Sequence, residues 1–315
     1  MANLLASPRS FKNKALLLKT ETTVGTDAVP TGAANWIEGR NVTITPMDAE
    51  TADRGIDQPY FGSGGKLQVA QYCKISFEVA LVGSGAAGTA PKLAPALLAC
   101  AMAETIVASA SAAYNLVSSA IGACSIYFNM DGVLHKLIGS RGTASVSMAS
   151  KSIPKIKFDF EAVFADPSTV ALPSVTKTGW LVEEPVSAAN TTALTINAVS
   201  LAMQSLDASL GNKLARINLP GPQTDLAITD RAVTANVTVL APALAAFDPF
   251  ALAKAGTNVP ISITHGSVAG KKAKLDLKGS LTGVEYDQIE GLLAYKLSID
   301  CAPVAGNDEF ALTFL

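Results

Sequence analysis

Apolar and polar side chains alternate most clearly over residues 73–81, where every odd position is apolar. This period of two is typical of a β-strand with one face in a core and the other in contact with water or a partner. The residues predicted to face the core are Ile75, Phe77, Val79 and Leu81, and those predicted to face outward are Lys74, Ser76 and Glu78.

A predicted helix follows this strand after a glycine-rich turn at residues 83–89. We expect the helix over residues 91–104, because proline suits the first helical turn and four apolar side chains fall on one face. These four are Leu93, Leu97, Leu98 and Met102. The same order of strand and helix occurs again in the second half, at residues 233–240 and 242–255.

The N-terminal residues 1–35 are polar and irregular in pattern, and we expect an arm there, followed by a strand over residues 36–45 that Pro46 ends. Residues 48–68 are charged and rich in glycine, with Pro59, Tyr60 and Phe61 at the apparent tip. Long loops of compact domains are usually functional or bound to a partner. The aromatic pair therefore predicts an interface.

The remainder of the first half predicts further strands. Residues 105–120 are small and polar, and we expect a surface loop or an extended arm. A hairpin is predicted from residues 123–130 and 133–138, joined by a tight turn at Asp131 and Gly132. A second strand pair is expected at residues 142–148 and 153–164.

The second half repeats this order of elements, which predicts an internal duplication. Strands are expected at residues 193–203, 261–265, 271–279 and 292–301, and a long loop at residues 210–226 carries Pro220 and Pro222. We predict a first domain at 1–168, a linker at 169–186 and a second domain at 187–315. The predicted fold is mainly β with a minor α part: two tandem β-sandwich or barrel domains, each with one short flanking helix and a long loop.

The C-terminal side chains Phe310, Leu312 and Phe314 alternate with smaller residues after a flexible lead at residues 306–308. This pattern predicts a terminal strand or arm that docks on another subunit.

Composition adds a reason to expect assembly. Only 16% of the 315 residues are charged, against about 25% in a typical soluble protein. A surface so poor in charge is usually covered by copies or partners. The net charge of −2 excludes a polybasic nucleic-acid binder. Residues 105–127 lack charge but are too polar for a membrane helix, and we expect a soluble chain without a signal peptide.

The sequence predicts no catalytic, cofactor or metal site. The four cysteines, Cys73, Cys100, Cys124 and Cys301, lack paired spacing and are expected to be buried free thiols. Residues 83–88 match the G-x-G-x-x-G pattern of dinucleotide sites. However, the preceding strand alternates, whereas a central parallel strand is apolar throughout, and the helix is expected to begin beyond the third glycine. A nucleotide-binding enzyme is therefore a remote alternative.

Several segments resemble the N-terminal part of the major tail (tail tube) proteins of long-tailed bacteriophages. They are residues 15–25, 30–35, 40–46 and 77–91. The resemblance implies a small β-sandwich with one flanking helix, whose sheets join those of neighbours in a barrel around a lumen. It also implies six domains per ring, so a chain with two domains would form a trimer with threefold and approximate sixfold symmetry.

The function implied by this resemblance is structural: stacked rings form the phage tail tube, the conduit for DNA ejection. The implied partners are other copies of the chain, the tape measure protein and viral DNA in the lumen, and the tail terminator and the baseplate or distal tail proteins at the ends. No membrane is involved, and assembly takes place in the host cytoplasm before the protein becomes part of the virion tail. The alternative is a virion or surface β-domain that binds a host ligand.

On the tail tube interpretation, the predicted sites are surfaces. Lys74, Ser76 and Glu78 face the lumen or a neighbouring subunit. Ring stacking is assigned to the two long loops, at Pro59, Tyr60, Phe61, Pro220 and Pro222.

Overall fold

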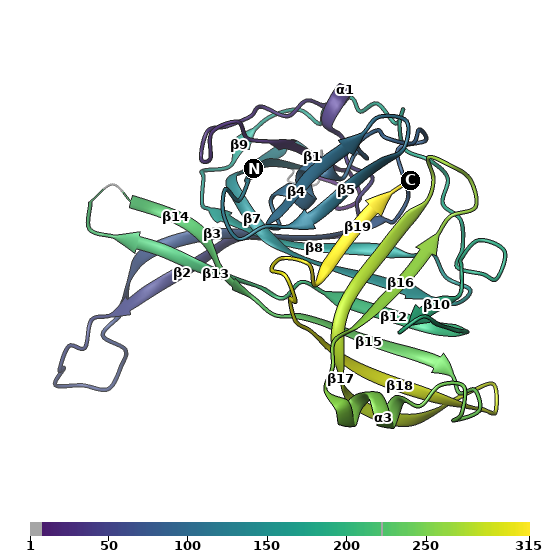
Figure 1. Cartoon of the computed structure of the whole chain (residues 1–315). Coiled ribbons are helices and arrows are strands. Elements are labelled where there is room, and N and C mark those ends of the chain that lie inside the picture. The colour runs from purple at the N-terminus through teal and green to yellow at the C-terminus, as the bar shows by residue number, and fades with distance from the viewer. Residues whose placement is uncertain (1–7, 222) are drawn as a thin grey trace.

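The computed structural model describes residues 8–221 and 223–315 and consists mainly of antiparallel strands (Figure 1). The strands of the first half are β1 (Lys14–Thr20), β2 (Arg40–Asp53), β3 (Lys66–Ala80), β4 (Met102–Val107), β5 (Ser111–Leu116), β6 (Cys124–Met130), β7 (Val133–Ala149), β8 (Lys155–Val163) and β9 (Ser168–Thr169). Those of the second half are β10 (Leu194–Ile196), β11 (Val199–Leu201), β12 (Met203–Ser209), β13 (Asn212–Leu219), β14 (Gln223–Arg231), β15 (Val233–Leu240), β16 (Val259–His265), β17 (Ala273–Ile289), β18 (Leu292–Cys301) and β19 (Phe310–Phe314). The helices are α1 (Gly32–Asn35), α2 (Ala94–Leu98) and α3 (Pro249–Ala255).

One sheet runs through both halves, and we call it the central sheet. Its strand order is β2-β3-β8-β7-β12-β15-β18-β17, and every pair is antiparallel. The pairing of β7 with β12 joins the halves. Shorter strands, among them β1 and β6, pack across the core face of this sheet. Leu18 of β1 and Phe128 of β6 therefore belong to the same buried cluster as Phe77 of β3. The mainly β fold with sandwich layers agrees with the prediction.

The alternation at residues 73–81 is confirmed as one buried face. Phe77 is 1% exposed and lies against Phe158 and Phe160 of β8, with ring centroids 5.4 and 5.9 Å away. The other residues predicted to face the core, Ile75, Val79 and Leu81, are buried as well. This aromatic cluster forms where β3 and β8 pair, because facing residues of antiparallel strands point to the same side of a sheet.

The strand pairing of the first half recurs in the second. The ladder β1-β6-β7-β8-β3-β2 corresponds to β10-β16-β17-β18-β15-β12. The strands β7 and β17 are both 17 residues long, and each has a register shift where it passes into the central sheet. A bulge bends a strand, which lets one strand serve both layers of a sandwich. The two predicted strands at 133–138 and 142–148 are therefore one strand, β7.

Both predicted helices are shorter than expected. The helix α2 ends at Leu98, and Met102 is the first residue of strand β4, after Ala101 adopts a left-handed φ of 62°. The helix α3 begins only at Pro249, where the Asp248 carboxylate accepts a hydrogen bond from the Ala251 N–H at 2.9 Å. At residues 102–104, the pairing of β4 with β5 outweighs the helical pattern of the alanine-rich segment at 91–104.

The segment predicted as a loop at residues 105–120 is a hairpin. Strands β4 and β5 pair with each other, and the second edge of β5 pairs with β19. The tight turn predicted at Asp131 and Gly132 is present between β6 and β7, and both residues have positive φ.

The N-terminal segment is more ordered than predicted. Strand β1 pairs with β6 and is largely buried, so residues 1–35 are not all an irregular arm. Strand β2 begins at Arg40 rather than Trp36 and continues past Pro46. Proline is tolerated there because, among the described residues, β2 pairs on one side only, and its register shifts between Thr45 and Asp48.

The two predicted long loops at 48–68 and 210–226 each form the outer part of a two-stranded hairpin. The outer parts of β2 and β3 form one hairpin arm, whose loop spans residues 54–65. Strands β13 and β14 form the other. Both arms extend from the same side of the body (Figure 1).

Candidate assembly surfaces

The central sheet ends in two strands with an unpaired edge. Within residues 8–221 and 223–315, β2 pairs only with β3, and residues 280–289 of β17 pair only with β18. On β17, Glu285, Tyr286 and Asp287 are exposed, and on β2, Thr43 and Thr45 are exposed. Unpaired edges present free backbone N–H and C=O groups, which favour pairing with another strand.

The pairing of β7 with β12 inside the chain shows how such an edge is closed. Val146 lies opposite Ala208, and Ser147 lies opposite Asp207. Val146 is 1% exposed and Ala208 is 2% exposed. The edge of one half is thus covered by the edge of the other, with apolar residues on the core face and polar residues on the opposite face.

The two arms carry several exposed apolar side chains. Phe61 is fully exposed at the tip of the first arm, and Tyr60 beside it is 69% exposed. Further exposed apolar residues on the arms are Ile56, Leu67, Val69 and Leu219. Pro59 lies on the same loop and Pro220 at the end of the second arm, whereas Pro222 lies outside the described residues. Projecting apolar groups of this kind mark interaction sites.

Arg216 of β13 holds the two arms together. Its guanidinium donates to Asp48 at 2.7 Å, to Glu161 at 2.9 Å and to Glu50 at 3.2 Å. It also lies 4.4 Å above the ring of Tyr72. The pKa of the Asp48 carboxyl is lowered by hydrogen bonds from Lys74 and Arg216. No local sequence pattern indicates this cluster, because its members come from four separate strands.

The outward face of the central sheet is polar and closely paired in charge. Lys74 binds Asp48 at 2.8 Å, and Lys155 binds Glu78 at 3.0 Å, which lowers the pKa of the Glu78 carboxyl. Ser76 lies between Lys74 and Glu78 on the same strand. Carboxylates and cations are nearly balanced on this face. The carboxylates are Asp48, Glu78, Asp159, Glu161, Asp207, Glu285, Asp287 and Asp300, and the cations are Arg40, Lys74, Arg141, Lys155, Lys157, Arg216 and Lys296.

The C-terminal strand corrects one prediction. Strand β19 lies between β17 and β5 of its own chain, and both its edges are paired (Figure 1). Phe310, Leu312 and Phe314 are each at most 3% exposed. The alternation does bury one face, but the strand closes a sheet between the two halves rather than docking on another subunit.

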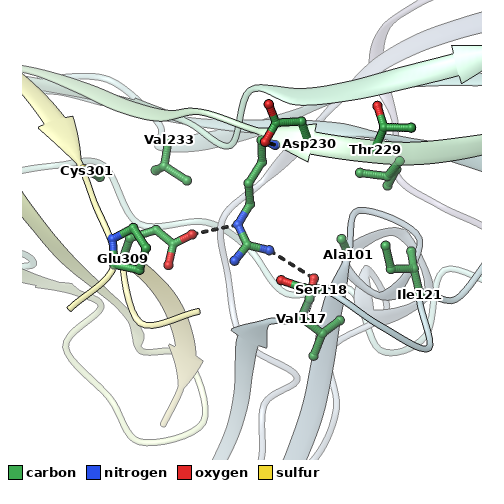
Figure 2. Close-up of a pocket in the computed structure, with 12 residues that line it drawn as sticks. Ala101, Val117, Ser118, Ile121, Thr229, Asp230, Val233, Cys301 and Glu309 are labelled. Atoms are coloured by element: carbon green, nitrogen blue, oxygen red, sulfur yellow. Dashed lines mark hydrogen bonds and ion pairs between the residues drawn. The ribbon is translucent and has the colours of Figure 1, made fainter. Parts of the chain in front are cut away.

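Arg231 fixes the segment that leads into this strand, through contacts with Glu309 and Val117 in the cleft that Figure 2 shows. Its Nε donates to Glu309 at 2.6 Å, and its Nη1 donates to the carbonyl oxygen of Val117 at 3.0 Å. These contacts border a cleft of about 290 Å³. Glu309 is 3% exposed, and a buried charge of this kind is tolerated because Arg231 pairs with it.

The glycine-rich turn at residues 83–89 packs against the backbone of two other segments, at Gly270 and Ser109. The Gly85 N–H donates to the carbonyl oxygen of Gly270 at 2.9 Å. A Cβ at Gly83 would lie 2.2 Å from that oxygen, and a Cβ at Gly88 would lie 2.4 Å from the backbone nitrogen of Ser109. Close backbone contacts therefore account for these glycines, with Gly270 of the second half for Gly83 and with Ser109 of the first half for Gly88, and the five-residue α2 begins six positions after Gly88.

The remaining candidate groups are structural. Cys73, Cys100, Cys124 and Cys301 are free and buried, and burial raises the pKa of each thiol. Buried His265 shares a hydrogen bond of 2.9 Å with the Thr191 hydroxyl. Across residues 8–221 and 223–315, no helix is both long and apolar enough to cross a membrane.

The unpaired sheet edges and the exposed apolar side chains of the arms, in the part of the chain that the structure describes, are typical of subunits that assemble with copies of themselves. The family model described as phage tail tube protein matches residues 12–298, which is most of the chain. The chain therefore belongs to the phage tail tube protein family, and the resemblance noted in its sequence is confirmed. A comparison with curated protein sequences gives no match. The protein is a structural component of the virion that assembles with itself into a tube.

Proposed function

We propose that three chains form each ring of the tail tube. Each chain would contribute two tube domains, residues 1–168 and 187–315, joined by the linker at 169–186. The observation that carries this proposal is the recurrence of one strand-pairing pattern in both halves. Six domains in a ring then require three chains, which gives threefold symmetry and approximate sixfold symmetry.

The mass of isolated rings tests this stoichiometry. Three chains per ring are expected, and six chains would overturn the assignment of one tube domain to each half. Negative-stain images of the purified protein test the function itself, because tubes or rings are expected. Dispersed monomers would favour the alternative, a β-domain that binds a host ligand.

We further propose that the outward face of the central sheet lines the lumen through which DNA leaves the particle. Most of its cations are paired with carboxylates, as in Lys74 with Asp48, Lys155 with Glu78 and Arg216 with Glu161, and this pairing would limit their binding to DNA phosphates. The tape measure protein would occupy the same lumen before ejection, and the tail terminator and the baseplate or distal tail proteins would cap the ends. Assembly would take place in the host cytoplasm, and no catalysis is involved.

The arms are proposed to connect successive rings. Tyr60 and Phe61 project into solvent on a hairpin that a partner surface would cover. The second arm, with Pro220 near its tip, extends on the same side, so both arms would reach the same neighbouring ring (Figure 1).

A further inference from the structure

We propose that neighbouring chains join by antiparallel pairing of β2 with β17 of the next copy, in one defined register. The inference rests on the proposed ring and names the residues that meet in it. The three facing pairs are Thr43 with Asp287, Ile44 with Tyr286, and Thr45 with Glu285. The template is the junction of β7 with β12, which the chain already forms between its own halves.

The first step is the equivalence of β2 and β12. Their partners β3 and β15 can be aligned because the residue that follows each strand makes the same backbone hydrogen bond. The Leu81 N–H donates to the carbonyl oxygen of Pro154 at 2.9 Å, and the Ala241 N–H donates to the carbonyl oxygen of Leu293 at 3.0 Å. This alignment places Ile75 of β3 on Ala235 of β15. Ile44 lies opposite Ile75 and Ala208 lies opposite Ala235. Ile44 therefore occupies the position of Ala208.

The second step is the equivalence of β17 and β7. The same alignment places Ile156 of β8 on Tyr295 of β18. Val146 lies opposite Ile156, and Tyr286 lies opposite Tyr295. Tyr286 therefore occupies the position of Val146. Since Val146 faces Ala208 inside the chain, Tyr286 should face Ile44 of the next copy.

The exposure of these residues fits a missing partner. Val146 is 1% exposed in the internal junction, whereas Tyr286 at the equivalent position is 67% exposed. Tyr286 lies beside Phe250 and Tyr295, with ring centroids 6.0 and 5.9 Å away. A β-branched side chain opposite an aromatic one is a favourable cross-strand pair. Ile44 would extend this aromatic cluster into the core of the junction.

The polar face is compatible with the same register. Thr43 would lie opposite Asp287, and Thr45 opposite Glu285. Each pair sets a hydroxyl donor against a carboxylate, and no two like charges face each other. The internal junction follows the same scheme, with Ser147 opposite Asp207.

Cysteine cross-linking tests the register in assembled tubes. Directly opposite residues are close enough for a disulfide, whereas residues displaced by two positions are about 7–8 Å apart and are not. In tubes of the double variant Thr43→Cys/Asp287→Cys, mild oxidation should link chains, and non-reducing gels should show dimers and trimers but nothing larger. The variant Thr43→Cys/Glu285→Cys is the shifted-register control and should remain monomeric. The native thiols are buried in the described fold.

An internal control uses the template junction. The variant Ser147→Cys/Asp207→Cys should form a disulfide within one chain, detected as a faster-migrating monomer. If the double variant at Thr43 and Asp287 fails to fold, a mixture of chains carrying one substitution each should give dimers only.

The outcomes separate this pairing from the proposed function. Normal tubes with cross-links only in the shifted variant would overturn the register. Normal tubes without cross-links in any intermolecular combination would overturn the pairing and leave the tube function intact. Failure of the unchanged protein to form tubes would overturn the proposed function and this pairing with it.

Discussion

Gly83 lies so close to Gly270 that a Cβ on Gly83 would be 2.2 Å from the Gly270 carbonyl oxygen. This contact joins the turn after β3 to the loop before β17, in the other half of the chain. We expect Gly83→Ala to destabilise the fold by about 1–3 kcal/mol, because the two backbones must separate. Gly64→Ala is the matched control, since its nearest neighbour would be 3.4 Å away. Equal unfolding free energies for both variants would contradict this role.

Truncation of Phe77 tests the core face of β3. Phe77→Ala removes a ring that is 1% exposed and packed against Phe158 and Phe160. We expect a loss of about 3–5 kcal/mol in the free energy of unfolding. Ser76→Ala on the opposite face should change it by less than about 0.5 kcal/mol. Chemical denaturation measures both, and a loss below about 1 kcal/mol for Phe77→Ala would argue against the assigned core face.

Replacement of Tyr60 and Phe61 by serine tests the stacking role of the first arm. Because both side chains are exposed in the single chain, folding and ring formation should be unchanged. Elongation should stop, since the apolar contact with the next ring is lost. Electron micrographs would then show rings without tubes. Leu292→Ser, at an exposed apolar residue away from the arms, serves as the control, and tubes of normal length from the Tyr60/Phe61 variant would refute the assignment.

The contact of Asp48 with Arg216 and Lys74 should make the arms sensitive to acid. The pKa of Asp48 is lowered in the folded protein, so its contribution to stability is present above the unfolded pKa of about 3.9 and is lost as the pH falls through the folded value. Asp48→Asn should therefore be less stable than the unchanged protein near pH 7. The difference should shrink as the pH falls below about 4. Asp57→Asn, on the exposed loop, is the control, and a constant difference for Asp48→Asn from pH 7 to pH 2 would contradict the assignment.

Deletion of residues 307–315 should destabilise the fold and not only the assembly. It removes β19 from between β17 and β5 and leaves Arg231 without Glu309. Loss of one member of a buried ion pair typically costs about 3–5 kcal/mol. Thermal unfolding should show a clear decrease in Tm for the deletion and a smaller one for Glu309→Gln, which retains the shape of the side chain. An unchanged Tm with impaired assembly would instead support docking on another subunit.

The sequence determined those features that depend on neighbours along the chain. Alternation identified the buried face of β3, and Asp131 with Gly132 identified the turn between β6 and β7, because side-chain direction and turn geometry are local properties. The order of strands and helices in the two halves could also be predicted, because it follows from these local patterns. The sequence also carried the family resemblance, which the match over residues 12–298 confirms.

The tertiary structure decided what depends on distant partners. The alternation of Phe310, Leu312 and Phe314 predicted a strand but not that its edges pair with β17 and β5. Similarly, residues 48–68 have a loop-like composition, yet residues 48–53 and 66–68 form strands because two chain segments pair with each other. The first and last glycines of the pattern G-x-G-x-x-G are required by close backbone contacts with Gly270 and Ser109, which lie elsewhere in the sequence. Pairing across a sheet depends on which segments meet in space, and a residue's own sequence neighbours do not specify that choice.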